Sequence, residues 1–271
     1  MRKQFLLCGL LTLMFFAFRT IDAICFINPK TGYYDGGSTV LRVVMAALLV
    51  ALVVLLNRRF KPCISTGSEK EKSSPAFLFF SLAGVFAFVA SLQGFFESAK
   101  YVVLAGKLVS GICCILGVLA ALWFFVTGFW YLRDSEKYTG GAYLSTTVIL
   151  WYCFRALTEF VTAPINANNS VIIAAVAVEL VLALFFLAFG RYLSLEDKQK
   201  NKAKTVALSF VVLFVVAGVG APTIISLVRA GDRREATLIL ADLLGALGGF
   251  FASSKFILKE RKDYDEQSKA H

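Results

Sequence analysis

The sequence predicts an all-α protein, a polytopic bundle of transmembrane helices, on three observations. Hydrophobic residues make up 58% of the 271 residues, whereas soluble domains contain about 45–50%, and the mean hydropathy is +0.72. These residues gather in runs long enough to cross a hydrocarbon core about 30 Å thick. Short loops rich in lysine and arginine separate the runs. Because none of the loops is long enough for a soluble domain, we expect a single helical bundle.

The first hydrophobic segment, residues 1–25, is a leader with two interpretations. A basic start at Arg2 and Lys3 precedes a 14-residue apolar run, residues 5–18. This pattern is typical of a signal peptide, with Ala23 as the cleavage point. The same run is also a short first span, since 14 residues of helix rise about 21 Å. Both interpretations predict the same orientation for the rest of the chain.

Seven further apolar segments are expected to form the transmembrane domain, residues 26–258. Their estimated limits are 39–56, 75–95, 108–132, 142–163, 171–190, 205–228 and 235–258. The segment 205–228 contains Gly218, Gly220 and Pro222, which predict a kink or a locally unwound stretch because proline removes a backbone donor. A charged tail, residues 259–271, follows the last segment.

The positive charges predict how the helices are oriented. With the amino terminus inside, 18 lysines and arginines fall on the cytoplasmic side and 6 on the other. This bias predicts that 58–74, 191–204 and the carboxyl terminus are cytoplasmic, while 164–170 is outside. The net charge of +10 follows the same pattern. We therefore expect a multi-pass cell-membrane protein whose partner is the lipid bilayer and not nucleic acid.

Several chemistries are excluded by what the sequence lacks. The single histidine is His271, at the end of the chain, and no HExxH, GxSxG or Walker sequence occurs. The six cysteines show no metal-ligand spacing and lie mostly in apolar runs, as small hydrophobic residues do. We expect no enzyme, no catalytic residue, no metal and no cofactor.

Four charged residues inside the expected spans form the candidate site. Arg155 and Glu159 are four residues apart and share a helix face, Glu179 lies near the centre of the next span, and Asp242 lies seven residues inside the last. An Arg, Lys or Asp at the centre of a span costs about 2.5–3.5 kcal/mol and normally finds a partner inside the bundle. We expect Arg155 to pair with Glu159 on its own helix and with Glu179 or Asp242 across helices.

Three acids against one base leave two interpretations of this cluster. In the first, carboxylates carry a proton, or the site holds water, a cation or a small cationic or amphiphilic solute. Glu97 and Lys107 would then lie at the rim of an outward-facing acidic cavity used for binding or transport. In the second, the charges only hold helices together. Gly245 and Gly249, at GxxxG spacing, predict close helix packing and favour a regulatory or scaffold protein with a membrane-protein partner.

Three segments carry a resemblance to known sequences. They read INPKTGYYDGG at 27–37, CFRALTEF at 153–160 and LFFLAFGRYLS at 184–194. Together with the leader, they resemble uncharacterised polytopic membrane proteins of clostridial-type bacteria. The resemblance implies a bacterial cytoplasmic membrane and no particular activity.

Overall fold

The computed structural model is helical in every regular element that it describes. It describes residues 2–26, 44–45, 47–48, 51–52, 73–98, 104–133, 141–162, 170–194, 198–220 and 233–269. Across these ranges there is no strand, so the predicted all-α class is confirmed. The helices are α1 (Arg2–Phe26), α3 (Ser74–Ser98), α4 (Leu104–Leu132), α5 (Gly141–Thr162), α6 (Ser170–Ser194), α7 (Lys198–Val215), the π-helical turn η1 (Val216–Gly220) and α9 (Arg233–Lys269).

Four of the described helices are long and apolar enough to cross a membrane. These stretches are Ser74–Ser98, Gly106–Leu132, Ala175–Leu193 and Arg234–Ser253. The protein is therefore an integral membrane protein. The seven spans and leader expected from the sequence also need α1, α5, α7 and the segment 39–56 to cross. Of the segment 39–56, the structure describes six residues, all helical.

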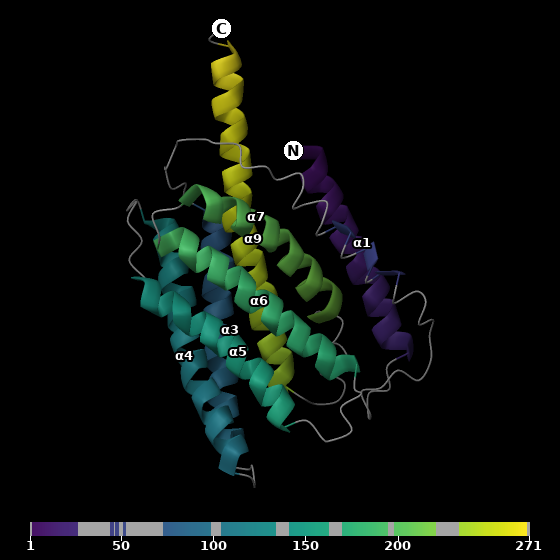
Figure 1. Ribbon diagram of the computed structural model, residues 1–271, viewed down its shortest axis with the longest axis vertical. Helices are drawn as coiled ribbons and strands as arrows, with labels where there is room; N and C mark the ends of the chain where they lie inside the picture. Colours follow the sequence, from purple (N-terminus) through teal and green to yellow (C-terminus); the bar gives the residue numbers. More distant parts are fainter. Residues whose placement is uncertain are drawn as a thin grey trace.

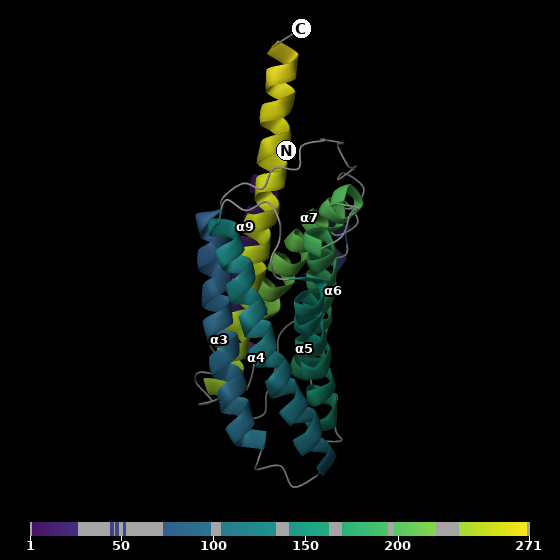
Figure 2. The same ribbon diagram turned by 90° about the vertical axis from the view of Figure 1, so that its left-hand side faces the viewer.

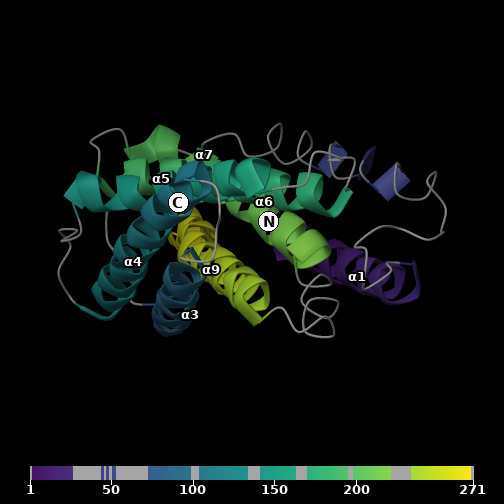
Figure 3. The ribbon, with the colours of Figure 1, turned by 90° about the horizontal axis from the view of Figure 1, so that it is seen from below.

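Six of the described helices close into a flattened ring. Each helix from α3 to α7 packs on the next, α7 packs on α9, and α9 packs on α3. Figures 1 and 2 show that consecutive helices of this ring run in alternate directions. The order places α5 opposite α9, and a contact between α6 and α9 flattens the ring. Figure 3 shows α1 at the edge of the bundle, where it packs on α7 and η1.

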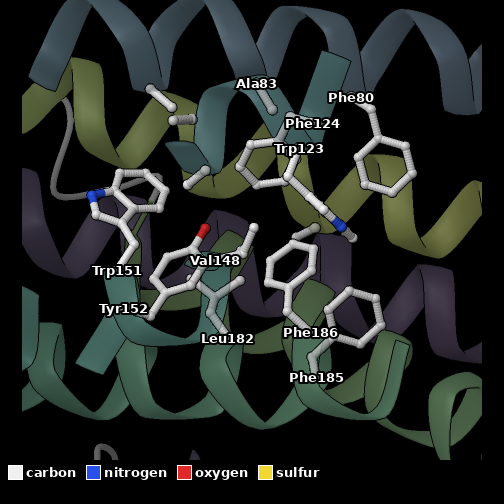
Figure 4. Close-up of a cluster of buried hydrophobic side chains, with 14 of the residues drawn as sticks. Phe80, Ala83, Trp123, Phe124, Val148, Trp151, Tyr152, Leu182, Phe185 and Phe186 are labelled. Atoms are coloured by element: carbon white, nitrogen blue, oxygen red, sulfur yellow. The ribbon is translucent and has the colours of Figure 1, made fainter. Parts of the chain in front are cut away.

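One end of the ring is filled by aromatic side chains. The aromatic cluster consists of Phe80 on α3, Trp123 and Phe124 on α4, and Phe185 and Phe186 on α6, all fully buried (Figure 4). The Trp123 and Phe186 rings meet edge to face, with centroids 5.6 Å apart. Because lipid is as apolar as this core, the rings stabilise the bundle by close packing and not by leaving water.

The outward surfaces of the ring are apolar, whereas the contact between α3 and α4 uses small residues. Leu82 and Phe88 on α3 and Leu122 on α4 are exposed. A contiguous apolar surface of this kind is expected where a protein faces lipid. On the inner face of α3, a Cβ at Gly84 would lie 3.1 Å from the Ala121 carbonyl oxygen, so glycine permits the close approach of the two helices.

The backbone of the seventh expected segment changes its pattern where the sequence predicts local unwinding. Residues Val216–Gly220 form a π-helical turn at the end of α7, and Pro222 lies outside the described residues. The side chain of Phe15, on α1, is buried there and stacks on Phe214 with ring centroids 4.4 Å apart. Ring atoms of Phe15 occupy the space that a Cβ at Gly218 would need. Glycine at this position is therefore what allows α1 to dock.

The last helix is longer than the expected span. The sequence places the end of the span at residue 258, but α9 continues as one helix to Lys269. Figures 1 and 2 show its final part projecting well beyond the ring. A helix needs an apolar face only where it is buried, and no Gly or Pro interrupts the stretch 250–269.

Candidate functional site

A charge trio, Arg155, Glu179 and Asp242, joins α5, α6 and α9 inside the ring. The exposed fractions of the three residues are 6%, 4% and 2%. The sequence offered Glu179 or Asp242 as the partner of Arg155 across helices, and the structure brings both acids to it. Because α5 and α9 lie on opposite sides of the ring, the long Arg155 side chain crosses its centre.

Arg155 holds Asp242 in a two-point contact. Nη1 of Arg155 donates to Oδ1 of Asp242 at 2.7 Å, and Nη2 donates to Oδ2 at 3.0 Å. This fork geometry gives two parallel charge-assisted hydrogen bonds, which are the strong kind. Both oxygens of Asp242 are therefore satisfied by the guanidinium.

Glu179 is held much less completely than Asp242. Its Oε1 lies 3.1 Å from Nε of Arg155, close enough for an ion pair. However, Nε of Arg155 and Oε2 of Glu179 are both buried, and neither makes a hydrogen bond within the described part of the chain. The two acids of the trio are thus unequal: one accepts a fork of two hydrogen bonds and the other has an open oxygen.

Two aromatic rings from the preceding turn of α5 enclose the guanidinium. Its Cζ lies 5.1 Å from the ring centroid of Trp151 and 5.4 Å from that of Tyr152, within reach of cation–π attraction. Tyr152 in turn stacks on Phe186, with centroids 5.6 Å apart and ring planes 3° apart. Figure 4 shows Trp151, Tyr152 and Phe186 in one row. The charge trio therefore rests directly against the aromatic cluster.

The glycines predicted to pack helices lie on the same stripe of α9 as Asp242. Positions 242, 245 and 249 follow the helical spacing that keeps residues on one face. A Cβ at Gly245 would lie 3.4 Å from Phe124 ring atoms, an ordinary contact, whereas ring atoms of Phe185 fill the space beside Gly249. Both glycines are buried against rings of their own chain. Their close packing is inside the ring.

Glu159 lies one turn beyond Arg155 on α5. It is half-buried and acts electrostatically on Glu179. The pairing of Glu159 with Arg155 on the same helix stays a prediction. The ion pairs of Arg155 with Glu179 and Asp242, by contrast, both run between helices.

An ion pair that the sequence does not predict lies near the other end of the ring. Nη1 of Arg234, at the start of α9, lies 3.4 Å from Oε2 of Glu97, near the end of α3. The side chain of Arg234 is 15% exposed and that of Glu97 is 45% exposed. Lys107, the other expected rim residue, is exposed on the first turn of α4. The count of positive charges assigns Arg234 to an external loop. The sequence contains no pattern that shows that α3 and α9 are neighbours.

Small polar residues lie between this ion pair and the charge trio. Cys113, on α4, lies close enough to Arg155 and Arg234 to feel the charge of both. The next residue, Cys114, is in the same way close to Arg234 and Glu97. Both thiols are buried, as are the hydroxyls of Ser110 and Thr158 nearby. We call these four residues the polar track. In the part of the chain that the structure describes, no three His, Cys, Asp or Glu side chains gather as metal ligands.

Comparison with known proteins adds no family to this geometry. No protein-family model matches the chain, and neither a curated protein nor a solved structure is similar enough to count as a match. The function is therefore argued from the charge trio and its surroundings alone.

Proposed function

We propose that this protein binds a proton, a cation or a small cationic or amphiphilic solute at the charge trio and moves it across the membrane. The observation that supports this proposal is the imbalance of charge: two buried carboxyl groups meet one buried guanidinium. An ionised carboxylate in a low-dielectric interior is costly unless it is paired. A site with one acid in excess therefore favours an exchangeable positive charge.

The proposal includes a topology of seven spans after the leader, with the carboxyl terminus in the cytoplasm of a bacterial cell. The count of 18 positive charges against 6 supports this orientation. The alternate directions of consecutive ring helices are consistent with it (Figures 1 and 2). The resemblance to membrane proteins of clostridial-type bacteria supports the cytoplasmic membrane as the location.

In this topology the ligand enters from the outer side. The Glu97–Arg234 pair and the polar track lie between the outer end of the ring and the trio. The aromatic cluster closes the cytoplasmic end. Polar groups at membrane depth are normally tolerated where they mark the path of an ion or a substrate. This asymmetry favours an outward-facing site.

The alternative is a regulatory or scaffold protein that acts through helix–helix contacts, with the trio as a structural link. In the sequence, the scaffold interpretation is supported by the GxxxG spacing of two glycines on α9. Gly245 and Gly249 contact Phe124 and Phe185 of the same chain, so this face is already covered. A purely structural link also gains nothing from a second, half-satisfied acid. Both points favour binding or transport.

Access from outside can be tested with two native cysteines. One variant keeps only Cys114, buried in the polar track, and a control keeps only Cys153, exposed on the outward face of α5; alanine replaces the other five cysteines. Thiolates react with a membrane-impermeant maleimide only where water reaches them. Because Cys114 is only 4% exposed, we expect it to react slowly in intact cells, when the outward path opens, and Cys153, which faces lipid, to stay unlabelled. If Cys114 is as unreactive as Cys153, the outward path does not exist and the proposal fails.

A further inference from the structure

We infer that the exchangeable ligand is a proton, that Glu179 carries it, and that Arg155 and Asp242 form a fixed counter-ion pair. This inference rests on the proposed function and narrows it to one ligand and one residue. Glu179 is 4% exposed, and its buried Oε2 makes no hydrogen bond to any residue that the structure describes. An open oxygen of this kind, beside a carboxylate that is already fully paired, marks the acid that changes its charge.

The position of the guanidinium argues against a metal cation. Arg155 lies in ion-pair contact with both acids, at 2.7 Å from Asp242 and 3.1 Å from Glu179. A metal ion between the two carboxylates would have to occupy the same space and would meet a like charge there. It would also need about six oxygen ligands. A proton adds to Oε2 of Glu179 without displacing any group.

Charges of both signs face Glu179. Arg155 on α5 favours its ionised form, whereas Glu159 on α5 and Asp242 and Glu235 on α9 favour its neutral form. Tyr152 on α5 is the remaining titratable group that packs on α6 nearby.

Among the described residues, the other elements that pack on α6 bring no further charge to this depth. The charged residues of α7 all lie in its first two turns, at the opposite end of the ring, and η1 has none. Arg155, the cation among the described charges that act on Glu179, is committed to Asp242 by two hydrogen bonds.

The step is a simple acid–base exchange. A hydronium ion breaks one of its O–H bonds and leaves as water, and its proton forms an O–H bond at Oε2 of Glu179, which turns a trio of net charge −1 into a neutral one. Release breaks the same bond and returns the proton to water, and no electron moves. When Glu179 is ionised, it attracts Nε of Arg155, which lies 3.1 Å from its Oε1, and protonation weakens this attraction. Proton binding is thereby coupled to an ion pair between α5 and α6.

Infrared difference spectra of the purified, lipid-reconstituted protein between alkaline and acidic pH test the inference. The parent should show a protonated-carboxyl band in an apolar environment, and Glu179→Gln should lose that band. The control Glu97→Gln, at the half-exposed ion pair, should keep it. Glutamine has the shape of a protonated glutamate, so Glu179→Gln should also melt at or above the parent temperature. Asp242→Asn, which breaks the fork, should melt lower.

Each other result has a definite meaning. A band that survives in Glu179→Gln shows that another carboxyl group carries the proton, and a Glu179→Gln protein that misfolds shows that Glu179 is needed as an ionised partner. Either result overturns the inference. If no such band appears but sodium, potassium or tetraphenylphosphonium raises the melting temperature of the parent and not of Glu179→Gln, the proposed function holds and the proton assignment fails. If neither protons nor these cations act through Glu179, both proposals fail.

Discussion

Arg155 has to be an arginine because of where its partners lie. Asp242 is on the opposite side of the ring, and only a long side chain reaches it from α5. The planar guanidinium then makes three separate contacts: a fork on Asp242, an ion pair with Glu179, and two aromatic faces. A lysine has neither the fork nor the flat surface that stacks on Trp151 and Tyr152.

Replacing Arg155 should therefore destabilise the bundle strongly. We expect Arg155→Gln to lower the free energy of unfolding by about 3–5 kcal/mol, because two buried acids lose their cation. Thermal melting in detergent at neutral pH measures the effect. Lys107→Gln, at an exposed position, is the control and should melt like the parent.

A double variant checks whether Asp242 is a true partner of Arg155. Removing both members of a buried pair costs less than removing one. Arg155→Gln combined with Asp242→Asn should thus recover part of the loss. An Arg155→Gln protein as stable as the parent would show that this residue is not buried against acids.

At the scale of elements, the sequence predicted where helices lie better than where they end or what they face. Hydropathy located α3, α4, α5 and α6 to within a few residues, because apolar runs and helices coincide inside a bilayer. It failed at the end of α9, where the helix continues through charged residues in the absence of Gly and Pro. The glycine spacing on α9 was visible, but the rings that cover it come from other helices.

The two glycines of α9 should differ in their tolerance of a methyl group. Ring atoms of Phe185 fill the space beside Gly249, whereas a Cβ at Gly245 makes ordinary contacts with Phe124. Overpacking a filled core typically costs about 1–3 kcal/mol. We expect Gly249→Ala to lower the melting temperature and Gly245→Ala to leave it nearly unchanged. Equal losses, accompanied by a change of oligomeric state, would instead support the scaffold interpretation.

The docking of α1 on η1 provides a test of the two interpretations of the leader. Cleavage after Ala23 would remove Phe15, the residue that fills the space beside Gly218. If α1 is retained, Gly218→Ala should lower the melting temperature of the purified protein. Gly111→Ala is the control, because nothing lies within 4 Å of its Cβ position. A Gly218→Ala protein that melts like the Gly111→Ala protein, with an intact mass lacking residues 1–23, would identify a signal peptide.

At the scale of the whole molecule, the uneven distribution of lysine and arginine predicts how the chain is oriented in the membrane. The packing of the ring does not supply this orientation. Reporter fusions after Glu71 and after Lys200 should both behave as cytoplasmic, since both follow basic segments. A fusion after Asn168 should behave as external. An external signal at Glu71 or Lys200 would reverse the orientation of the polar track and the aromatic cluster.

The candidate site was predictable in its members but not in its arrangement. Charged residues inside apolar runs stand out in any sequence, so Arg155, Glu179 and Asp242 could be found from depth alone. The difference between Asp242 and Glu179 in their hydrogen bonding could not be predicted, because it depends on the direction in which the Arg155 guanidinium points. The Glu97–Arg234 pair was missed for a related reason: residues far apart in sequence meet only because α9 closes the ring against α3.

The length of α9 makes it a lever arm. Its 37 residues span about 55 Å at the usual rise, and Asp242 lies in the same unbroken helix as the charged residues that project beyond the ring. A tilt of about 10° at Ser253 would move Lys269 by roughly 4 Å, since some 16 residues of helix lie between them. Any tilt of α9 inside the ring would thus become a larger displacement at the far end of this helix.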